Sequence, residues 1–112
     1  MITDAEFARA GEAALESLNR AMDTVAENHD VEILYQGGVL RVEIESPEPA
    51  ARIVISPNSA VRQIWISAQS TSFKLDWSEE RGEFVWTSSG ESLTDLAGRL
   101  VGEELGVGPI RL

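Results

Sequence analysis

Two kinds of hydrophobic periodicity divide the chain, and they restrict its possible folds more than any other feature. Near both ends, apolar residues recur every three to four positions, which is typical of one apolar stripe on a helix. Between residues 31 and 87 they alternate at period two, in about six short runs. Strands with one polar face favour an antiparallel sheet. The economical arrangement packs both helices on the apolar face and leaves the other face in water.

A capping box is predicted to start the first helix, with the Thr3 hydroxyl and the Glu6 carboxylate each satisfying a free backbone N–H group. This helix is predicted to run to about Glu27. Its sheet-facing stripe is predicted to contain Phe7, Gly11, Ala14, Leu15, Leu18, Met22 and Val25. The stripe of the last helix is predicted to contain Leu93, Leu96, Ala97, Leu100, Val101 and Leu105. Gly106 is predicted to end that helix, and residues 107–112 to pack beside the helices.

Residues 61–68 show the period-two alternation clearly and are predicted to form the fourth strand. The side chains predicted to face the core are Ile64, Ile66 and Ala68. The side chains predicted to face water are Gln63, Trp65 and Ser67. An exposed tryptophan is typical of a binding hot spot, although packing under a loop at the sheet edge would also bury one. Because both helices cover the opposite face, nothing remains to bury Trp65, and we predict its partial exposure.

The remaining strands complete a meander with short connections. They are predicted at residues 31–35, 39–45, 52–56, 73–77 and 84–87, with Pro57 ending the third strand and a loop at 46–50. The predicted fold is therefore α+β, a two-layer sandwich in one domain over residues 1–112. Its N- and C-terminal helices pack on one face of a five- to six-stranded antiparallel sheet.

Composition excludes several classes of function. The net charge of −10 argues against binding to nucleic acid or anionic membranes, and favours a basic protein partner or cations. Without cysteine there is no disulfide, thiolate metal site or thiol nucleophile. The sequence has no membrane-spanning apolar run or signal segment, so we expect a cytoplasmic protein or a mature chain after processing. A single aromatic on the visible sheet face favours a mostly monomeric protein. The sequence has no phosphate-binding loop and no Ser–His–Asp arrangement, so we expect that it is not an enzyme. Iron oxidation as a weak side activity is not predicted either.

The first third of the chain carries most of the charge. Residues 1–32 contain eight acidic and two basic side chains, a net charge of −6. The exposed face of the first helix and the start of the first strand, called here the acidic face, contains Glu12, Glu16, Asp23, Glu27, Asp30 and Glu32. Such a pattern is usually a solvated helix face, but its carboxylates also suit iron. Arg20 interrupts it, and His29 is interpreted as a helix-end residue rather than a ligand.

Any metal binding on this face is expected to be weak. Helical carboxylates three or four residues apart are close enough to share a cation, but they form no closed cage. We therefore expect iron, as Fe(II) or Fe(III), to exchange readily and to compete with calcium, manganese and cobalt. The same carboxylates could dock on a lysine- or arginine-rich partner and accelerate encounter.

In this order and at these spacings, several short segments resemble the frataxin family, and within it the small bacterial CyaY-type members. They are the acidic first helix, Asp30-Val31-Glu32, Gly37-Gly38-Val39-Leu40, Ile53-Val54-Ile55, Gln63-Ile64-Trp65 and Ser89-Gly90-Glu91. The resemblance covers nearly the whole chain. It implies a two-layer sandwich that binds iron weakly, serves iron–sulfur cluster assembly and modulates or supplies iron to a cysteine desulfurase. The iron–sulfur scaffold protein is a further implied partner.

The resemblance also implies site residues. The metal positions that match the family are Asp4, Glu12, Asp23, Asp30 and Glu32, and helix geometry adds Glu16 and Glu27. The implied partner-binding positions are Gln63 and Trp65, with Ser67 on the same face. The chain departs from the family pattern at Asn19, Arg20, Ser56, Ala60, Arg62 and Ser88. Asn19 and Arg20 dilute the acidic face, so the affinity and stoichiometry of iron stay open.

A different class of function remains compatible with the sequence. Small acidic adaptors and secretion-type chaperones are also short α+β proteins, and they bind basic partners without metal. Such proteins usually expose larger apolar patches and dimerise. The sequence leaves open whether a desulfurase would be inhibited or activated, and whether metal would cause oligomerisation.

Overall fold

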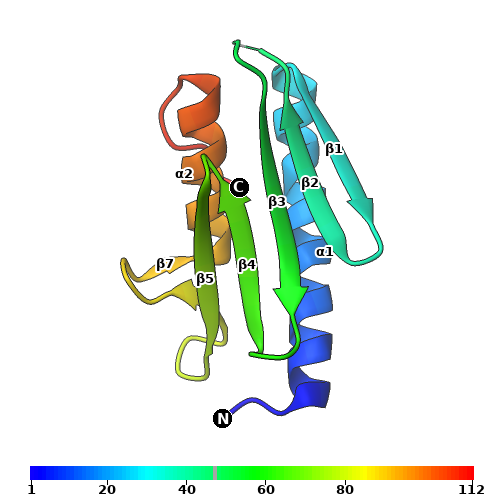
Figure 1. Ribbon diagram of the computed structural model, residues 1–112, viewed down its shortest axis with the longest axis vertical. Coiled ribbons are helices and arrows are strands. Elements are labelled where there is room, and N and C mark those ends of the chain that lie inside the picture. Colours follow the sequence, from blue (N-terminus) through cyan, green and yellow to red (C-terminus); the bar gives the residue numbers. More distant parts are fainter. Residues whose placement is uncertain (47) are drawn as a thin grey trace.

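The seven strands of the sheet lie side by side in the order in which they occur in the chain. A computed structural model describes residues 1–46 and 48–112. Its elements are α1 (Asp4–Asn28), β1 (Val31–Gln36), β2 (Val39–Ile44), β3 (Ala51–Asn58), β4 (Gln63–Ala68), β5 (Thr71–Ser78), β6 (Glu83–Trp86), β7 (Glu91–Ser92) and α2 (Leu93–Leu105). Every neighbouring pair of strands is antiparallel, and the strand order is β1-β2-β3-β4-β5-β6-β7 (Figure 1).

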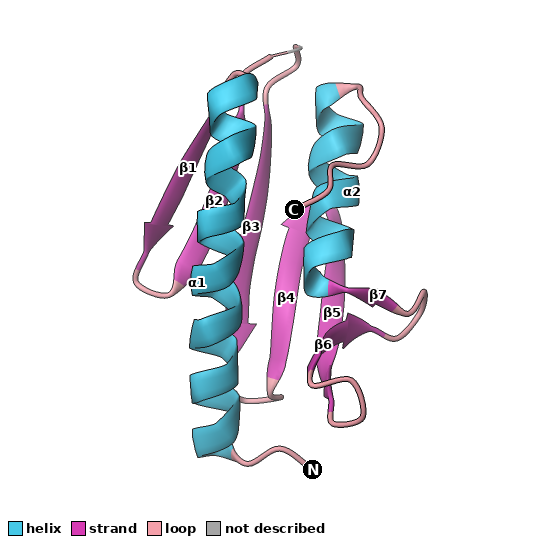
Figure 2. Cartoon of the chain, turned by 180° about the vertical axis from the view of Figure 1, so that it is seen from behind, coloured by secondary structure: helices cyan, strands magenta, loops and turns pink. Residues whose placement is uncertain are grey.

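Both helices cover the same face of the sheet, which confirms the predicted two-layer α+β sandwich. Figure 2 shows α1 lying along the β1–β3 side and α2 lying over β4 and β5. The opposite face, called here the outer sheet face, is turned away from both helices (Figure 1). None of the helices in the described part of the chain has the length and apolar character needed to span a bilayer.

Local signals fix the ends of both helices as predicted. The Thr3 hydroxyl accepts the N–H of Glu6 at 3.1 Å, and the Glu6 carboxylate accepts the N–H of Thr3 at 2.9 Å, which completes the capping box. The Ser92 hydroxyl caps α2 by accepting the N–H of Asp95. Gly106 follows α2 with a φ of 74°, a left-handed conformation that favours glycine.

The core lies between the helices and the sheet. The predicted stripe residues of both helices are buried except Ala14, which lies at the margin and is half-buried. Ile64 and Ile66 of β4 are completely buried in the same cluster. The tail beyond α2 packs as predicted, because the N–H of Ile110 donates to the carbonyl oxygen of Gly98 at 3.1 Å. A side chain on Gly98 would overlap the backbone of Ile110.

The sheet differs from the prediction in three places. The fourth strand begins at Gln63 rather than at residue 61, because residues 59–62 form the β3–β4 turn, in which Arg62 has a φ of 52°. β3 does not end before Pro57, which pairs with Ile64. Proline is tolerated there because β2 pairs with β3 only as far as Ile55, so no second strand needs an N–H group from Pro57. No strand is predicted at residues 91–92, where Glu91 and Ser92 form β7 and make the sheet seven-stranded. Within the predicted loop at 46–50, Pro47 lies outside the described residues.

Candidate functional site

The outer sheet face carries the first of two candidate surfaces. Gln63, Trp65 and Ser67 lie on this face of β4, the middle strand, opposite the buried Ile64 and Ile66. Trp65 is half-buried, which confirms the predicted partial exposure. The alternative of a tryptophan under a loop at the sheet edge is wrong, because strands pair with β4 on both sides.

Side chains of β4 and β5 hold Trp65 in place. The indole Nε1–H donates to Oε1 of Gln63 at 2.8 Å, and the Gln63 amide Nε2 donates to Oδ1 of Asp76 at 3.0 Å. Lys74 lies directly opposite Trp65 on β5, with Nζ 4.8 Å from the ring centroid. A cation at this distance is attracted by the electron-rich face of the ring. Sequence reasoning missed Lys74 and Asp76, although alternation along β5 would place both on its polar face.

The acidic face of α1 and β1 is the second candidate surface. Its six carboxylate residues, Glu12, Glu16, Asp23, Glu27, Asp30 and Glu32, are all exposed. The last turn of α1 contains no basic residue, so the negative end of the helix dipole adds to the charge of Glu27 and Asp30. Mutual repulsion at this end of the helix would be relieved by a bound cation or by a basic partner.

Two further acidic residues lie beside the start of β1. Glu43 of β2 is directly opposite Glu32, and the backbone N–H of Glu45 donates to the carbonyl oxygen of Asp30 at 3.1 Å. Glu43 also forms an ion pair with Arg52 at 3.1 Å, so part of its charge is already neutralised. Alternation along residues 39–45 places Glu43 and Glu45 outward, but their proximity to Asp30 depends on the pairing register.

Asp4 lies apart from the other predicted metal-binding residues. It occupies the first turn of α1, roughly 35 Å along the helix from Glu27 at a rise of about 1.5 Å per residue. Its Oδ1 accepts from Nε of Arg62 at 2.7 Å, which brings a cation to this carboxylate. Arg62 precedes β4 with a φ of 52°. Asp4 and Glu27 therefore cannot share one ion.

The acidic face has an extended rather than a closed geometry. Among residues 1–46 and 48–112, no three His, Asp or Glu side chains are grouped closely enough to hold a metal ion.

Two neighbouring side chains are affected by the acidic face or by the helix end beside it. The pKa of the Tyr35 hydroxyl on β1 is raised, first by burial and then by the charges of Glu16 and Glu12. His29 is half-buried and lines a hollow with residues 110–112 of the tail.

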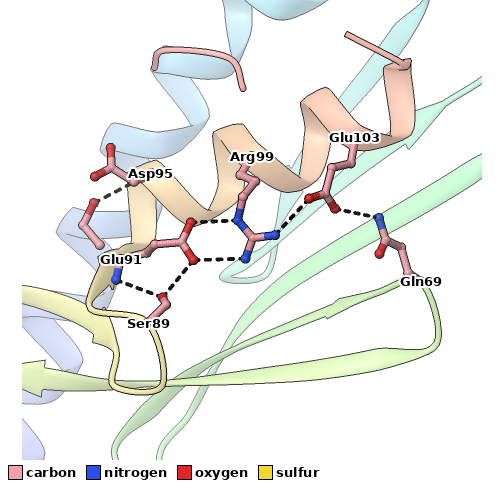
Figure 3. Close-up of polar contacts among 7 residues, drawn as sticks. Gln69, Ser89, Glu91, Asp95, Arg99 and Glu103 are labelled. Carbon is pink, nitrogen blue, oxygen red and sulfur yellow. Dashed lines mark hydrogen bonds and ion pairs between the residues drawn. The ribbon is translucent and has the colours of Figure 1, made fainter. Parts of the chain in front are cut away.

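A third polar cluster fastens α2 to the sheet (Figure 3). Arg99 binds both carboxylate oxygens of Glu91, through Nε at 2.8 Å and Nη2 at 3.0 Å, and binds Glu103 through Nη1 at 2.9 Å. Ser89 donates to Glu91, while Gln69 of the β4–β5 turn donates to Glu103. Hydrogen bonds from Arg99 lower the pKa of Glu91, and those to Glu91 raise the pKa of Arg99. The Ser89-Gly90-Glu91 segment thus has a structural role.

Sequence comparison identifies relatives over most of the chain. The CyaY protein of Azotobacter vinelandii, named an iron–sulfur cluster assembly protein, is 28% identical over 107 residues, covering 94% of this chain and 91% of the relative. The protein of the same name from Pseudomonas fluorescens is 30% identical over 94 residues, covering 82% of this chain and 83% of the relative.

Structural comparison identifies a solved structure with the same fold. The frataxin of Psychromonas ingrahamii superposes with a TM-score of 0.78 and covers 97% of both chains. At 15% identity this likeness concerns the fold alone. The family model of the frataxin-like domain matches residues 1–107. Because that match extends from before α1 to beyond α2, the chain belongs to the frataxin family.

Proposed function

We propose that the chain serves iron–sulfur cluster assembly by docking on a cysteine desulfurase and by binding iron weakly on the acidic face. The scaffold protein of the same pathway is a second proposed partner. The proposal extends to this chain the role stated in the names of the CyaY relatives. Nothing in it requires the chain to catalyse a reaction, and iron is treated as cargo rather than as a resident cofactor.

The observation that carries the docking proposal is the half-buried Trp65 in the middle of the outer sheet face. Its indole is held by Gln63, and Ser67 lies exposed two residues further along β4. Aromatic side chains at the centre of an otherwise polar surface provide much of the binding energy in protein interfaces. Neighbouring polar groups then exclude water from the contact.

The docking proposal is tested by measuring the affinity for the desulfurase of the same organism. Trp65→Ala should weaken binding by about 30-fold or more, the range of hot-spot residues. Leu34→Ala is the matched control, because Leu34 is also an outward-facing apolar residue of the sheet, 41% exposed on the edge strand β1. Equal affinities of Trp65→Ala and the wild type would overturn the docking proposal, provided that both are folded.

The iron proposal rests on the donor chemistry and charge of the acidic face. Carboxylate oxygens are suitable ligands for Fe(II) and Fe(III), and the C-terminal end of α1 has no basic side chain to neutralise Glu27 or Asp30. The proposed metal residues remain Asp4, Glu12, Glu16, Asp23, Glu27, Asp30 and Glu32. Since Asp4 is paired with Arg62 at the far end of the helix, its share of the iron should be small.

Anaerobic equilibrium dialysis with Fe(II) tests the iron proposal. A triple variant with Glu27→Gln, Asp30→Asn and Glu32→Gln should bind less iron than the wild type. The matched control carries Glu79→Gln, Glu80→Gln and Asp95→Asn, which change the net charge equally but lie in the β5–β6 turn and in the first turn of α2. If both triple variants lose the same amount of iron, binding reflects only total charge.

A metal-independent adaptor is the second candidate function. The observation in its favour is that no group of three potential ligands is close enough to hold a metal in the described residues. In that case the acidic face would act only by attracting a basic partner. Desulfurase binding that depends on Trp65, combined with no iron binding in dialysis, would favour this candidate.

A further inference from the structure

Two hydrogen bonds, called here the relay, connect the Trp65 indole to the Gln63 amide and the Gln63 amide to Asp76. They indicate a role for Asp76 that its sequence position did not indicate. We propose that Asp76 is a positioning residue for the docking surface, because it fixes the Gln63 amide and thereby the Trp65 indole. The proposal rests on the proposed docking function. It concerns the state of the free protein, in which Gln63 and Trp65 would already have the orientation required by the partner.

The chemistry of the relay permits only one orientation of Gln63. An indole N–H is a donor only, so the group facing Trp65 must be the amide oxygen, Oε1. An ionised carboxylate is an acceptor only, so the group facing Asp76 must be the amide nitrogen, Nε2. The observed distances of 2.8 Å and 3.0 Å satisfy both requirements at once. A flipped amide would set two donors against each other at Trp65 and two acceptors at Asp76.

The strand register makes this relay rigid. Gln63 pairs directly with Asp76, and Trp65 pairs directly with Lys74, on the adjacent strands β4 and β5. Lys74 adds a second restraint by placing its ammonium group over the Trp65 ring. Restraint of a side chain before docking removes part of the entropy cost of binding. Loss of the relay should therefore weaken binding about three- to tenfold.

The relay also limits what the partner can contact. The single indole N–H of Trp65 already donates to Oε1 of Gln63, so it cannot donate to the partner without breaking that bond. The partner should instead meet the indole ring, and because the Lys74 ammonium already lies over that ring, an apolar group is favoured at the contact.

A direct contact between Asp76 and the partner is the rival explanation. Asp76 lines a hollow together with Val61, Arg62 and Glu79, and a basic side chain of the partner could enter it. The two explanations differ in what they require of residue 76. Positioning requires a hydrogen-bond acceptor, whereas a direct ion pair requires a negative charge.

Two substitutions separate these requirements. Asp76→Ala removes both the acceptor and the charge, whereas Asp76→Asn removes the charge and keeps an acceptor oxygen. The first readout is the indole ¹H–¹⁵N signal of Trp65 in the free protein, with its hydrogen-exchange rate. The second is the affinity for the desulfurase. The indole signals of Trp77 and Trp86, which pack against the core, report whether each variant is folded.

We expect Asp76→Ala to shift the Trp65 indole signal, to accelerate its exchange and to weaken binding about three- to tenfold. Asp76→Asn should recover most of both properties. Gln63→Leu should reproduce the indole change, and adding Asp76→Ala to it should change the indole no further. A Trp65 indole signal that is the same in Asp76→Ala as in the wild type would overturn the proposal. If Asp76→Ala and Asp76→Asn weaken desulfurase binding equally, the proposal would also be overturned, in favour of a direct charge contact between Asp76 and the partner.

The result is separable from the docking proposal. If Trp65→Ala binds the desulfurase as tightly as the wild type, docking at this surface fails. The response of the indole signal to Asp76→Ala would still decide whether the relay orients Trp65 in the free protein.

Discussion

The outer sheet face and the acidic face differ in how their polar side chains are held. On the outer sheet face, Trp65, Gln63 and Asp76 are joined by hydrogen bonds, and Lys74 lies against the Trp65 ring. On the acidic face, the carboxylates are exposed, and no three potential ligands among the described residues are grouped around a common point. The first surface has a defined shape, which suits recognition, whereas the second has charge without shape, which suits attraction and exchangeable cations.

The largest expected effects are on the kinetics of desulfurase binding, where the two surfaces should control different rate constants. Trp65→Ala should mainly accelerate dissociation, because it removes a contact that forms in the complex. The triple variant Glu27→Gln, Asp30→Asn and Glu32→Gln should mainly slow association and reduce its dependence on salt. Stopped-flow or surface-based kinetics at several salt concentrations would measure both. A change in association alone for Trp65→Ala would break the distinction between the two surfaces.

The next effect compares the exposed carboxylates with a carboxylate that has a partner. Glu91 is bound by Arg99, which lowers its pKa, so its stabilising contribution is fully present above the unfolded pKa of about 4.3. It is lost as the pH falls through the lower folded pKa. Arg99→Ala should destabilise the protein by about 1–2 kcal/mol at neutral pH, and by less in acid. Urea unfolding across a pH series measures this difference, with Arg99→Lys as the control that keeps the charge.

Neutralising a carboxylate on the acidic face should raise the stability of the protein, by a smaller amount than Arg99→Ala lowers it. Glu27→Gln places a neutral side chain next to the negative end of the α1 dipole, so we expect an increase in stability of about 0.3 kcal/mol. Salt or divalent cations should raise the melting temperature of the wild type more than that of the variant. Thermal unfolding in a salt series tests this. A melting temperature that falls with salt would contradict mutual repulsion on this face.

The smallest effect uses the single tyrosine as a reporter of the acidic face. Burial and the charges of Glu16 and Glu12 raise the pKa of Tyr35, so Glu16→Gln should lower it towards the usual value. A cation bound near Glu16 should act in the same direction. Ultraviolet absorbance of the tyrosinate during a pH titration measures the change. Glu80→Gln, in the β5–β6 turn, is the control and should leave this titration unchanged.

Features encoded by neighbouring residues were predictable from the sequence. The capping box at Thr3 and Glu6, the apolar stripes of both helices and the alternation in β4 depend on contacts within one element. The resemblance to frataxins then identified the family, which the matched model confirms. The proposed metal and partner residues came largely from that resemblance, and they remain predictions.

Features that depend on strand register were not predictable. The β4–β5 hairpin turns at Gln69 and Ser70, whose φ angles of 54° and 62° are left-handed although neither residue is glycine. Because this hairpin lacks the usual Asn-Gly signal, its register, and hence the pairing of Gln63 with Asp76, was not predictable. The ion pair between Asp4 and Arg62 joins residues far apart in the chain, and periodicity along one element carries no information about it.

One NMR experiment tests the central claim that the two surfaces have separate roles. Fe(II) is added anaerobically to the ¹⁵N-labelled protein, and the desulfurase is added to a second sample. We predict that iron broadens the signals of Glu12, Glu16, Asp23, Glu27, Asp30 and Glu32 and leaves the Trp65 indole sharp. The desulfurase should perturb the Trp65 indole and the signals of Gln63 and Ser67. Iron broadening centred on Trp65, or no iron response on α1 at millimolar Fe(II), would contradict the account.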